Sequence, residues 1–132
     1  WYAAGHVARA LAAVLLGDRK RAASERKYFE GSCKCYSPIG TSGRAYDAIL
    51  GLLEATEGEW DPAVRHLRDG ASFCRASGYL PELGWTCLDL AEALLQRNKS
   101  DDQKEALVAL EEGEEVAGSL QVIPILEKIN TC

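Results

Sequence analysis

Apolar and polar residues along this chain recur with the period of an α-helix. In the segment 62–77, Ala63, Leu67 and Cys74 fall at spacings that place them on one helix face. The segment 44–57 carries a second apolar stripe of the same period. These two stripes predict a pair of amphipathic helices, each with one face that must be buried.

A short corner separates these two predicted helices. Gly58 is the residue type that most readily ends a helix in a left-handed conformation. Asp61 is expected to cap the second helix, and Pro62 to take its first position, where a missing N–H costs nothing. The corner therefore predicts an antiparallel hairpin.

The rest of the chain repeats this arrangement. The predicted helices span about 2–16, 19–35, 44–57, 62–77, 81–97 and 102–118, and a last one begins near Pro124. Residues 36–43 are rich in helix breakers and are expected to form a loop. No stretch sustains the two-residue alternation of a half-buried strand, so the sequence predicts an all-α fold.

An internal repeat supports this division into hairpins. Residues of one predicted helix recur in a later predicted helix at an offset of 43 positions. The matching pairs are Ala63 with Ala106, Leu67 with Leu110, Gly70 with Gly113, and Cys74 with Ala117. Pro81 and Pro124 share the same offset. The units are therefore predicted at about 2–35, 44–78 and 81–119, and 122–132 begins a further or capping helix. The first unit keeps the pattern poorly, as terminal repeats commonly do.

The sequence 50–63, Leu-Gly-Leu-Leu-Glu-Ala-Thr-Glu-Gly-Glu-Trp-Asp-Pro-Ala, resembles the signature of tetratricopeptide repeats. The matching features are a small residue at Gly51, the corner Gly58-Glu59-Trp60, an early Ala63 and a later small Gly70. The resemblance implies a right-handed superhelix of about three antiparallel hairpins, an α-solenoid in one domain. The period here is longer than the 34 residues of that family. HEAT or armadillo repeats share the longer period but lack the Gly-Glu-Trp corner, and they remain the alternative fold.

The long second helices and the proline-initiated first helices resemble the arrays of large bacterial signalling proteins, such as LuxR-type transcription regulators. That likeness implies a non-catalytic module for protein–protein interaction or for coupling to other domains of the same chain. In the family the first helices of the hairpins line a concave groove. By that register the groove residues of this chain are Ala45, Ala48, Ile49, Leu52 and Ala55, and then Trp85, Leu88, Asp89, Glu92 and Leu95. The open alternatives are that neighbouring helices bury this stripe, or that the domain senses a small effector.

Charge and composition exclude several other functions. The net charge of −5 argues against direct nucleic-acid binding, which needs clustered Lys and Arg. No run approaches the roughly 20 apolar residues of a membrane span. Five cysteines without a regular framework indicate reduced thiols and a cytoplasmic setting. The pair Cys33 and Cys35 has no C-x-x-C or His partner, so neither a metal nor another cofactor is expected.

The histidines and the chain ends complete the expectations. His66 is expected to face solvent or the next repeat, and neither it nor His6 has an evident orienting carboxylate, so no catalytic site is predicted. The chain begins at Trp1 and contains no Met, which suggests a piece of a longer protein. The apolar edge near Ile125 and Ile129 makes self-association through the terminal repeats a further expectation.

Overall fold

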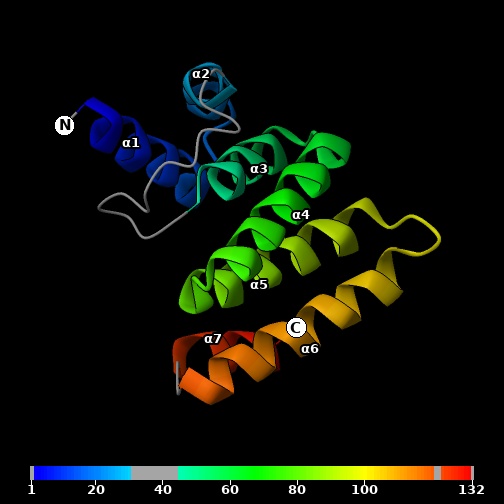
Figure 1. The fold of residues 1–132 in the computed structure, drawn as a ribbon. Helices are drawn as coiled ribbons and strands as arrows, with labels where there is room; N and C mark the ends of the chain where they lie inside the picture. The colour runs from blue at the N-terminus through cyan, green and yellow to red at the C-terminus, as the bar shows by residue number, and fades with distance from the viewer. Residues whose placement is uncertain (1, 31–44, 121–122, 132) are drawn as a thin grey trace.

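The computed structural model describes residues 2–30, 45–120 and 123–131 of the 132-residue chain. Within these ranges all regular structure is α-helical and there is no strand, which confirms the all-α prediction. The helices are α1 (Tyr2–Leu16), α2 (Arg19–Glu30), α3 (Tyr46–Glu57), α4 (Trp60–Ser77), α5 (Leu80–Arg97), α6 (Asp102–Leu120) and α7 (Ile123–Asn130) (Figure 1). The predicted end of the second helix at 35 and the predicted loop 36–43 lie outside the described residues.

The helix ends follow from their residue types. Gly58 closes α3 with φ 83°, and its N–H donates to the carbonyl oxygen of Ala55 at 3.0 Å, as the sequence predicted. Gly78 ends α4 in the same left-handed region, with φ 74°. Asn98 closes α5 at φ 54°, a conformation that Asn tolerates better than most residues.

The predicted start of α4 was wrong by two residues. The helix begins at Trp60 with Glu59 before it, and no side chain caps it. Asp61 is thus already inside the first turn, where its negative charge is favourable near the helix N-terminus. Its carboxylate is used instead to bind the cations of the next helical corner, as described below.

Each helix packs against the next one along the chain, from α1 with α2 through to α6 with α7. Alternate helices also touch: α1 contacts α3, α3 contacts α5, and α5 contacts α7. In Figure 1 α4 and α6 run in the same direction, with α5 returning between them. The chain therefore advances through successive hairpins, and the first helices of these hairpins lie next to one another.

Glycines allow the helices of one hairpin to approach closely. A Cβ placed on Gly51 of α3 would lie 2.7 Å from Leu67 Cγ and 3.0 Å from the carbonyl oxygen of Ala63, both in α4. Gly70 of α4 approaches the backbone of Ala48 in the same way. At these positions a larger residue would push the two helices apart.

The core has two parts that meet at α3. One cluster, formed by α1, α2 and one side of α3, contains Phe29, Ile49 and Leu53. The other joins α3 to α4, α5 and α6 and contains Leu67 and Leu94. In α6 the repeat positions Ala106, Gly113 and Ala117 are buried, as their partners Ala63, Gly70 and Cys74 are in α4.

None of the described helices combines the length and the apolar character that crossing a membrane requires.

Candidate partner-binding groove

A groove of about 550 Å³ lies between the first helices of the hairpins and the start of α4. Its lining residues are Val14 and Gly17 at the end of α1, Leu52, Ala55 and Thr56 in α3, Trp60 and Leu67 in α4, and Asp89, Glu92, Ala93, Leu95 and Gln96 in α5. Most of them are apolar. Leu95 is 44% exposed at the rim, whereas Leu67 is fully buried at the base. The groove is therefore an open apolar surface with a packed floor.

The α5 wall supplies the charge of the groove. Asp89, Glu92 and Gln96 recur at spacings of three and four residues, which places them on one face of that helix. Glu92 forms a wide ion pair of 3.7 Å with Lys128 Nζ of α7, and both side chains are about half exposed. Among the described lining residues none is Lys, Arg or His. The groove consequently combines an apolar floor with a negative wall.

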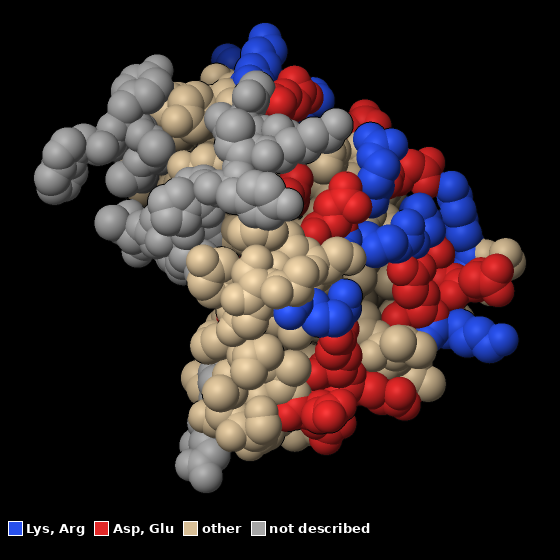
Figure 2. Space-filling view, in the orientation of Figure 1, with Lys and Arg blue, Asp and Glu red and all other residues tan. Residues whose placement is uncertain are grey.

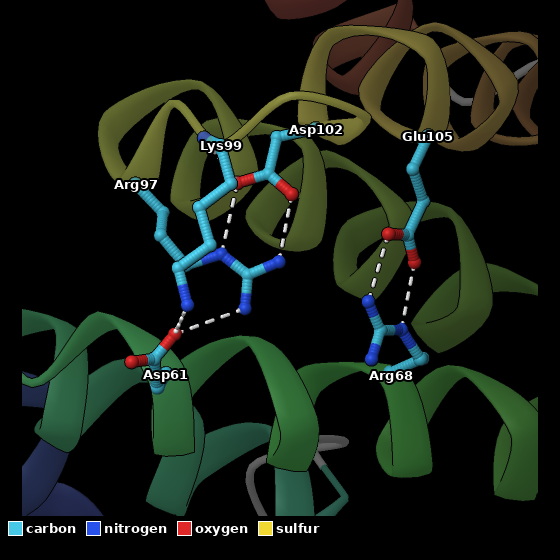
Figure 3. Close-up of polar contacts among 6 residues, drawn as sticks. All are labelled: Asp61, Arg68, Arg97, Lys99, Asp102 and Glu105. Atoms are coloured by element: carbon cyan, nitrogen blue, oxygen red, sulfur yellow. Dashed lines mark hydrogen bonds and ion pairs between the residues drawn. The ribbon is translucent and has the colours of Figure 1, made fainter.

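Ion pairs tie the corner before α4 to the corner before α6 (Figure 3). Asp61 accepts hydrogen bonds from Lys99 Nζ at 2.6 Å and from Arg97 Nη1 at 3.2 Å. Arg97 also donates two hydrogen bonds, of 2.7 and 2.8 Å, to the buried Asp102 carboxylate. These hydrogen bonds from Arg97, with one from the backbone N–H of Lys99, lower the pKa of Asp102 to about 2. The network fixes the end of the groove that holds Trp60.

Two paired arginine–glutamate contacts join α4 to α6 across α5. Arg68 donates two hydrogen bonds of 2.7 Å to Glu105, as Figure 3 shows, and Arg75 does the same to Glu112 at 2.6 and 2.7 Å. In Figure 2 red and blue side chains gather together near the starts of α4 and α6. The planar guanidinium fixes the direction of a carboxylate as well as its distance. The two contacts therefore set how α4 and α6 lie relative to each other.

The structure places the predicted groove residues in three groups. Those that line the groove are Leu52, Ala55, Asp89, Glu92 and Leu95. Those buried in the core are Ala45, Ala48, Ile49 and Leu88, at 3% exposure or less. Trp85 is partly buried and lies outside the residues that line the groove. Neighbouring helices thus cover the second group, which was one of the two alternatives that the sequence left open.

The sequence analysis took groove residues only from the predicted helices 44–57 and 81–97, and it missed several lining residues that lie in other helices. Val14 lies 41 positions before Ala55, just as Gly17 lies 41 positions before Gly58, so the first unit matches the second at this offset and the sequence carried this signal. Trp60 was assigned only to the corner. Because α4 begins at Trp60 rather than at Pro62, this indole belongs to the helix and lies against the groove.

Both histidines pair with a glutamate of the other helix in their hairpin. His66 Nδ1 lies 2.5 Å from Glu54 Oε1, and His6 Nδ1 lies 2.6 Å from Glu25 Oε2. Arg9 also donates to Glu25. The predictions that His66 faces solvent or the next repeat, and that the histidines lack an orienting carboxylate, were therefore wrong. The carboxylates lie 12 and 19 positions away in sequence, and only the packing of the helices brings them close.

The pKa of His66 predicts a pH-dependent stability. The close pairing with the Glu54 carboxylate raises the pKa of His66 above 6.5, although burial opposes the rise. The stabilisation is therefore fully present below pH 6.5 and is lost as the pH rises through the folded-state pKa. Urea unfolding of the wild type and of His66→Gln at pH 6 and pH 9 is expected to show a stability difference that shrinks at the higher pH. An equal difference at both values would contradict this assignment.

The described cysteines are buried. Neither Cys74 nor Cys87 forms a disulfide, and each is at most 1% exposed. Burial, with the nearby Glu112 carboxylate, raises the pKa of Cys87 to about 12, so this thiol stays protonated and is a poor nucleophile. Within residues 2–30, 45–120 and 123–131, no group of three or more His, Cys, Asp or Glu is arranged to hold a metal ion. Cys33, Cys35 and Cys132 lie outside those ranges.

No protein-family model, curated protein or solved structure matches this chain. Its function is therefore inferred from the groove itself.

Proposed function

We propose that this chain is a non-catalytic interaction module that receives a segment of a partner protein, or of another domain of its own chain, in the groove. The observation that carries the proposal is a preformed apolar groove of about 550 Å³ with exposed Leu95 at its rim and Trp60 in its wall. An apolar surface of this kind costs free energy in water, and aromatic residues are frequent anchors of protein interfaces. Groove binding explains why such a surface is left open.

The proposal includes a tetratricopeptide-like superhelix as the architecture. Three features support it: successive hairpins, contacts between alternate helices, and buried repeat positions at the 43-residue offset. The close contacts at Gly51 and Gly70 are those expected of small residues in such hairpins. An array of this kind places the first helices side by side, so several of them can contact one partner segment.

The likeness to the arrays of LuxR-type regulators extends the proposal to its setting. In a regulator of that type, the groove would couple the module to a regulatory partner in the bacterial cytoplasm. Sequencing the parent gene tests this extension. An adjoining nucleotide-binding module and a helix-turn-helix would support it, and an unrelated neighbour would remove the regulatory part while leaving the groove proposal intact.

A groove-filling substitution tests the proposed function. Gln96 is exposed and lines the groove, so Gln96→Trp is expected to occupy the groove without disturbing the core. Gln103→Trp, on an exposed position of α6 outside the groove, is the matched control. Peptides selected from a displayed library on the wild-type protein should bind Gln96→Trp at least about tenfold more weakly, a loss of about 1.4 kcal/mol. Binding to Gln103→Trp should be unchanged.

One result of this peptide-binding experiment would contradict the proposal. If the selected peptides bind Gln96→Trp and the wild type equally well, the groove is not the binding surface. Circular dichroism melts of both variants show that each is folded before affinities are compared.

A small effector is the second candidate because the groove volume lies within the range of small-molecule sites. A thermal-shift screen of small amphiphilic compounds separates the two functions. A compound that stabilises the wild type and Gln103→Trp but not Gln96→Trp would favour a sensor. Peptide binding without any such compound favours the interaction module.

A further inference from the structure

We propose that the outer face of α6 joins two copies of this chain in a weak antiparallel dimer. The contact stripe consists of Lys104, Leu107, Val108 and Glu111, all of which are exposed. None of these residues lines the groove, so the dimer leaves the groove of each copy open and does not depend on the proposed function. The stripe also differs from the apolar edge near Ile125 that the sequence suggested for self-association, because Ile125 is fully buried.

Two aliphatic side chains lie open at the centre of this stripe. Leu107 is 57% exposed and Val108 is 62% exposed. They lie opposite the face of α6 that packs in the core, which carries Ala106 and Gly113. Single exposed apolar residues are common on protein surfaces, so this pair gains its meaning from the charges beside it.

Those charges make the stripe complementary to itself. Lys104 lies three positions before Leu107, and Glu111 lies three positions after Val108. In an antiparallel pair with its two-fold axis between positions 107 and 108, Lys104 of one copy faces Glu111 of the other, about 5 Å from the axis. The symmetry provides this contact twice and brings the aliphatic side chains of both copies together at the axis. A parallel pair would instead place Lys104 against Lys104.

Both charges are available for such a contact. Within the described residues, neither Lys104 nor Glu111 forms an ion pair inside the folded chain. Glu105 on the same helix is by contrast already bound by Arg68. Association therefore breaks no existing ion pair, and it gives each of the two charges an opposite partner as its surroundings lose water.

The internal repeat does not explain the stripe. The residues at the same positions of α4, 43 places earlier, are Asp61, Val64, Arg65 and Arg68. Val64 is fully buried, and Asp61 and Arg68 hold ion pairs within the molecule. Since α4 has no exposed self-complementary stripe, the one on α6 is a property of this helix rather than of the repeat.

Sedimentation equilibrium between about 0.01 and 1 mM chain tests the dimer. Its centre contains only four aliphatic side chains, and small interfaces associate weakly. The expected dissociation constant is on the order of 0.1 mM. Leu107→Ser combined with Val108→Ser is expected to weaken association at least about tenfold.

A matched control removes a different exposed aliphatic pair. Leu15 and Leu16 at the end of α1 are 86% and 74% exposed, more than the pair on α6. Leu15→Ser combined with Leu16→Ser should therefore leave the dimer unchanged if association is specific to α6. Circular dichroism melts establish that both double variants are folded before their masses are compared.

Charge reversal tests the antiparallel arrangement. Lys104→Glu and Glu111→Lys each place like charges at both symmetric contacts, so each variant alone is expected to weaken the dimer at least about tenfold. An equimolar mixture of the two variants should associate within about threefold of the wild type, because every contact then joins opposite charges. A chain carrying both substitutions should associate equally well for the same reason.

Several results would overturn the inference. These are a wild-type chain that stays monomeric at about 1 mM, a dimer that the serine pair on α6 does not weaken, and a dimer that is lost in the α1 control. Single charge reversals without effect, or a mixture that fails to associate, would rule out the antiparallel stripe. Peptide binding to the groove is measured at about 1 µM chain, where the protein is monomeric, so the proposed function stands or falls separately.

Discussion

Replacing Phe29 by alanine is expected to lower the free energy of unfolding by about 3–5 kcal/mol. The ring is fully buried in the cluster formed by α1, α2 and α3. It also makes edge-to-face contacts with Tyr28 and Tyr46, at centroid distances of 5.2 and 5.3 Å. Removing it deletes a large apolar surface and leaves a cavity between α2 and α3. Urea denaturation followed by circular dichroism measures the loss.

Phe73 in α4 provides the matched comparison. Its ring is only partly buried, so Phe73→Ala removes the same atoms from a site that already contacts water. The expected cost is about 1–2 kcal/mol, in proportion to the smaller buried area. If Phe29→Ala costs no more than Phe73→Ala, then α2 is not packed on α3 as described.

Gly51→Ala is expected to destabilise the protein by about 1–3 kcal/mol, although alanine is the better helix former by about 1 kcal/mol. The added methyl would lie 2.7 Å from Leu67 Cγ and 3.0 Å from the carbonyl oxygen of Ala63. Neither atom can move freely, because one belongs to a fully buried side chain and the other to the α4 backbone. The two helices must therefore separate. Thermal and urea unfolding both report the change.

Two further variants make this prediction specific. Gly118→Ala places a methyl in open space on α6, so it should stabilise the protein by up to about 1 kcal/mol. Combining Gly51→Ala with Leu67→Ala relieves the closest contact, so the double variant should lose less stability than the sum of the single losses. Strict additivity would mean that the two residues are not in contact.

Much of the fold could be predicted because helix ends depend on local chemistry. Gly58 and Gly78 carry positive φ where the sequence placed helix ends. The first helix, 2–16, has the predicted bounds in the structure. The start of α4 was wrong because Asp61 resembles an N-cap in sequence, whereas its carboxylate binds Lys99 and Arg97 from a corner more than 35 residues later. Local patterns do not contain such distant partners.

The candidate site was harder to predict than the fold. Helical periodicity shows which residues share a face, and Asp89, Glu92 and Leu95, which it placed on one face, all line the groove. It does not show how deeply a neighbouring helix covers that face, so Ile49 and Leu88 were assigned to the groove although they are fully buried. The His66–Glu54 pair was missed for the same reason: it depends on the distance between two helices.

The two walls of the groove are held by different parts of the core. One wall, at Val14 and Gly17, belongs to the α1–α2 hairpin, whereas the opposite wall belongs to α5 and is held by the other cluster. Parts of one protein that pack in different clusters can unfold locally at different free energies of opening. A partner that touches both walls would therefore contact helices of both core clusters, and its binding free energy would add to the free energy needed to separate those helices.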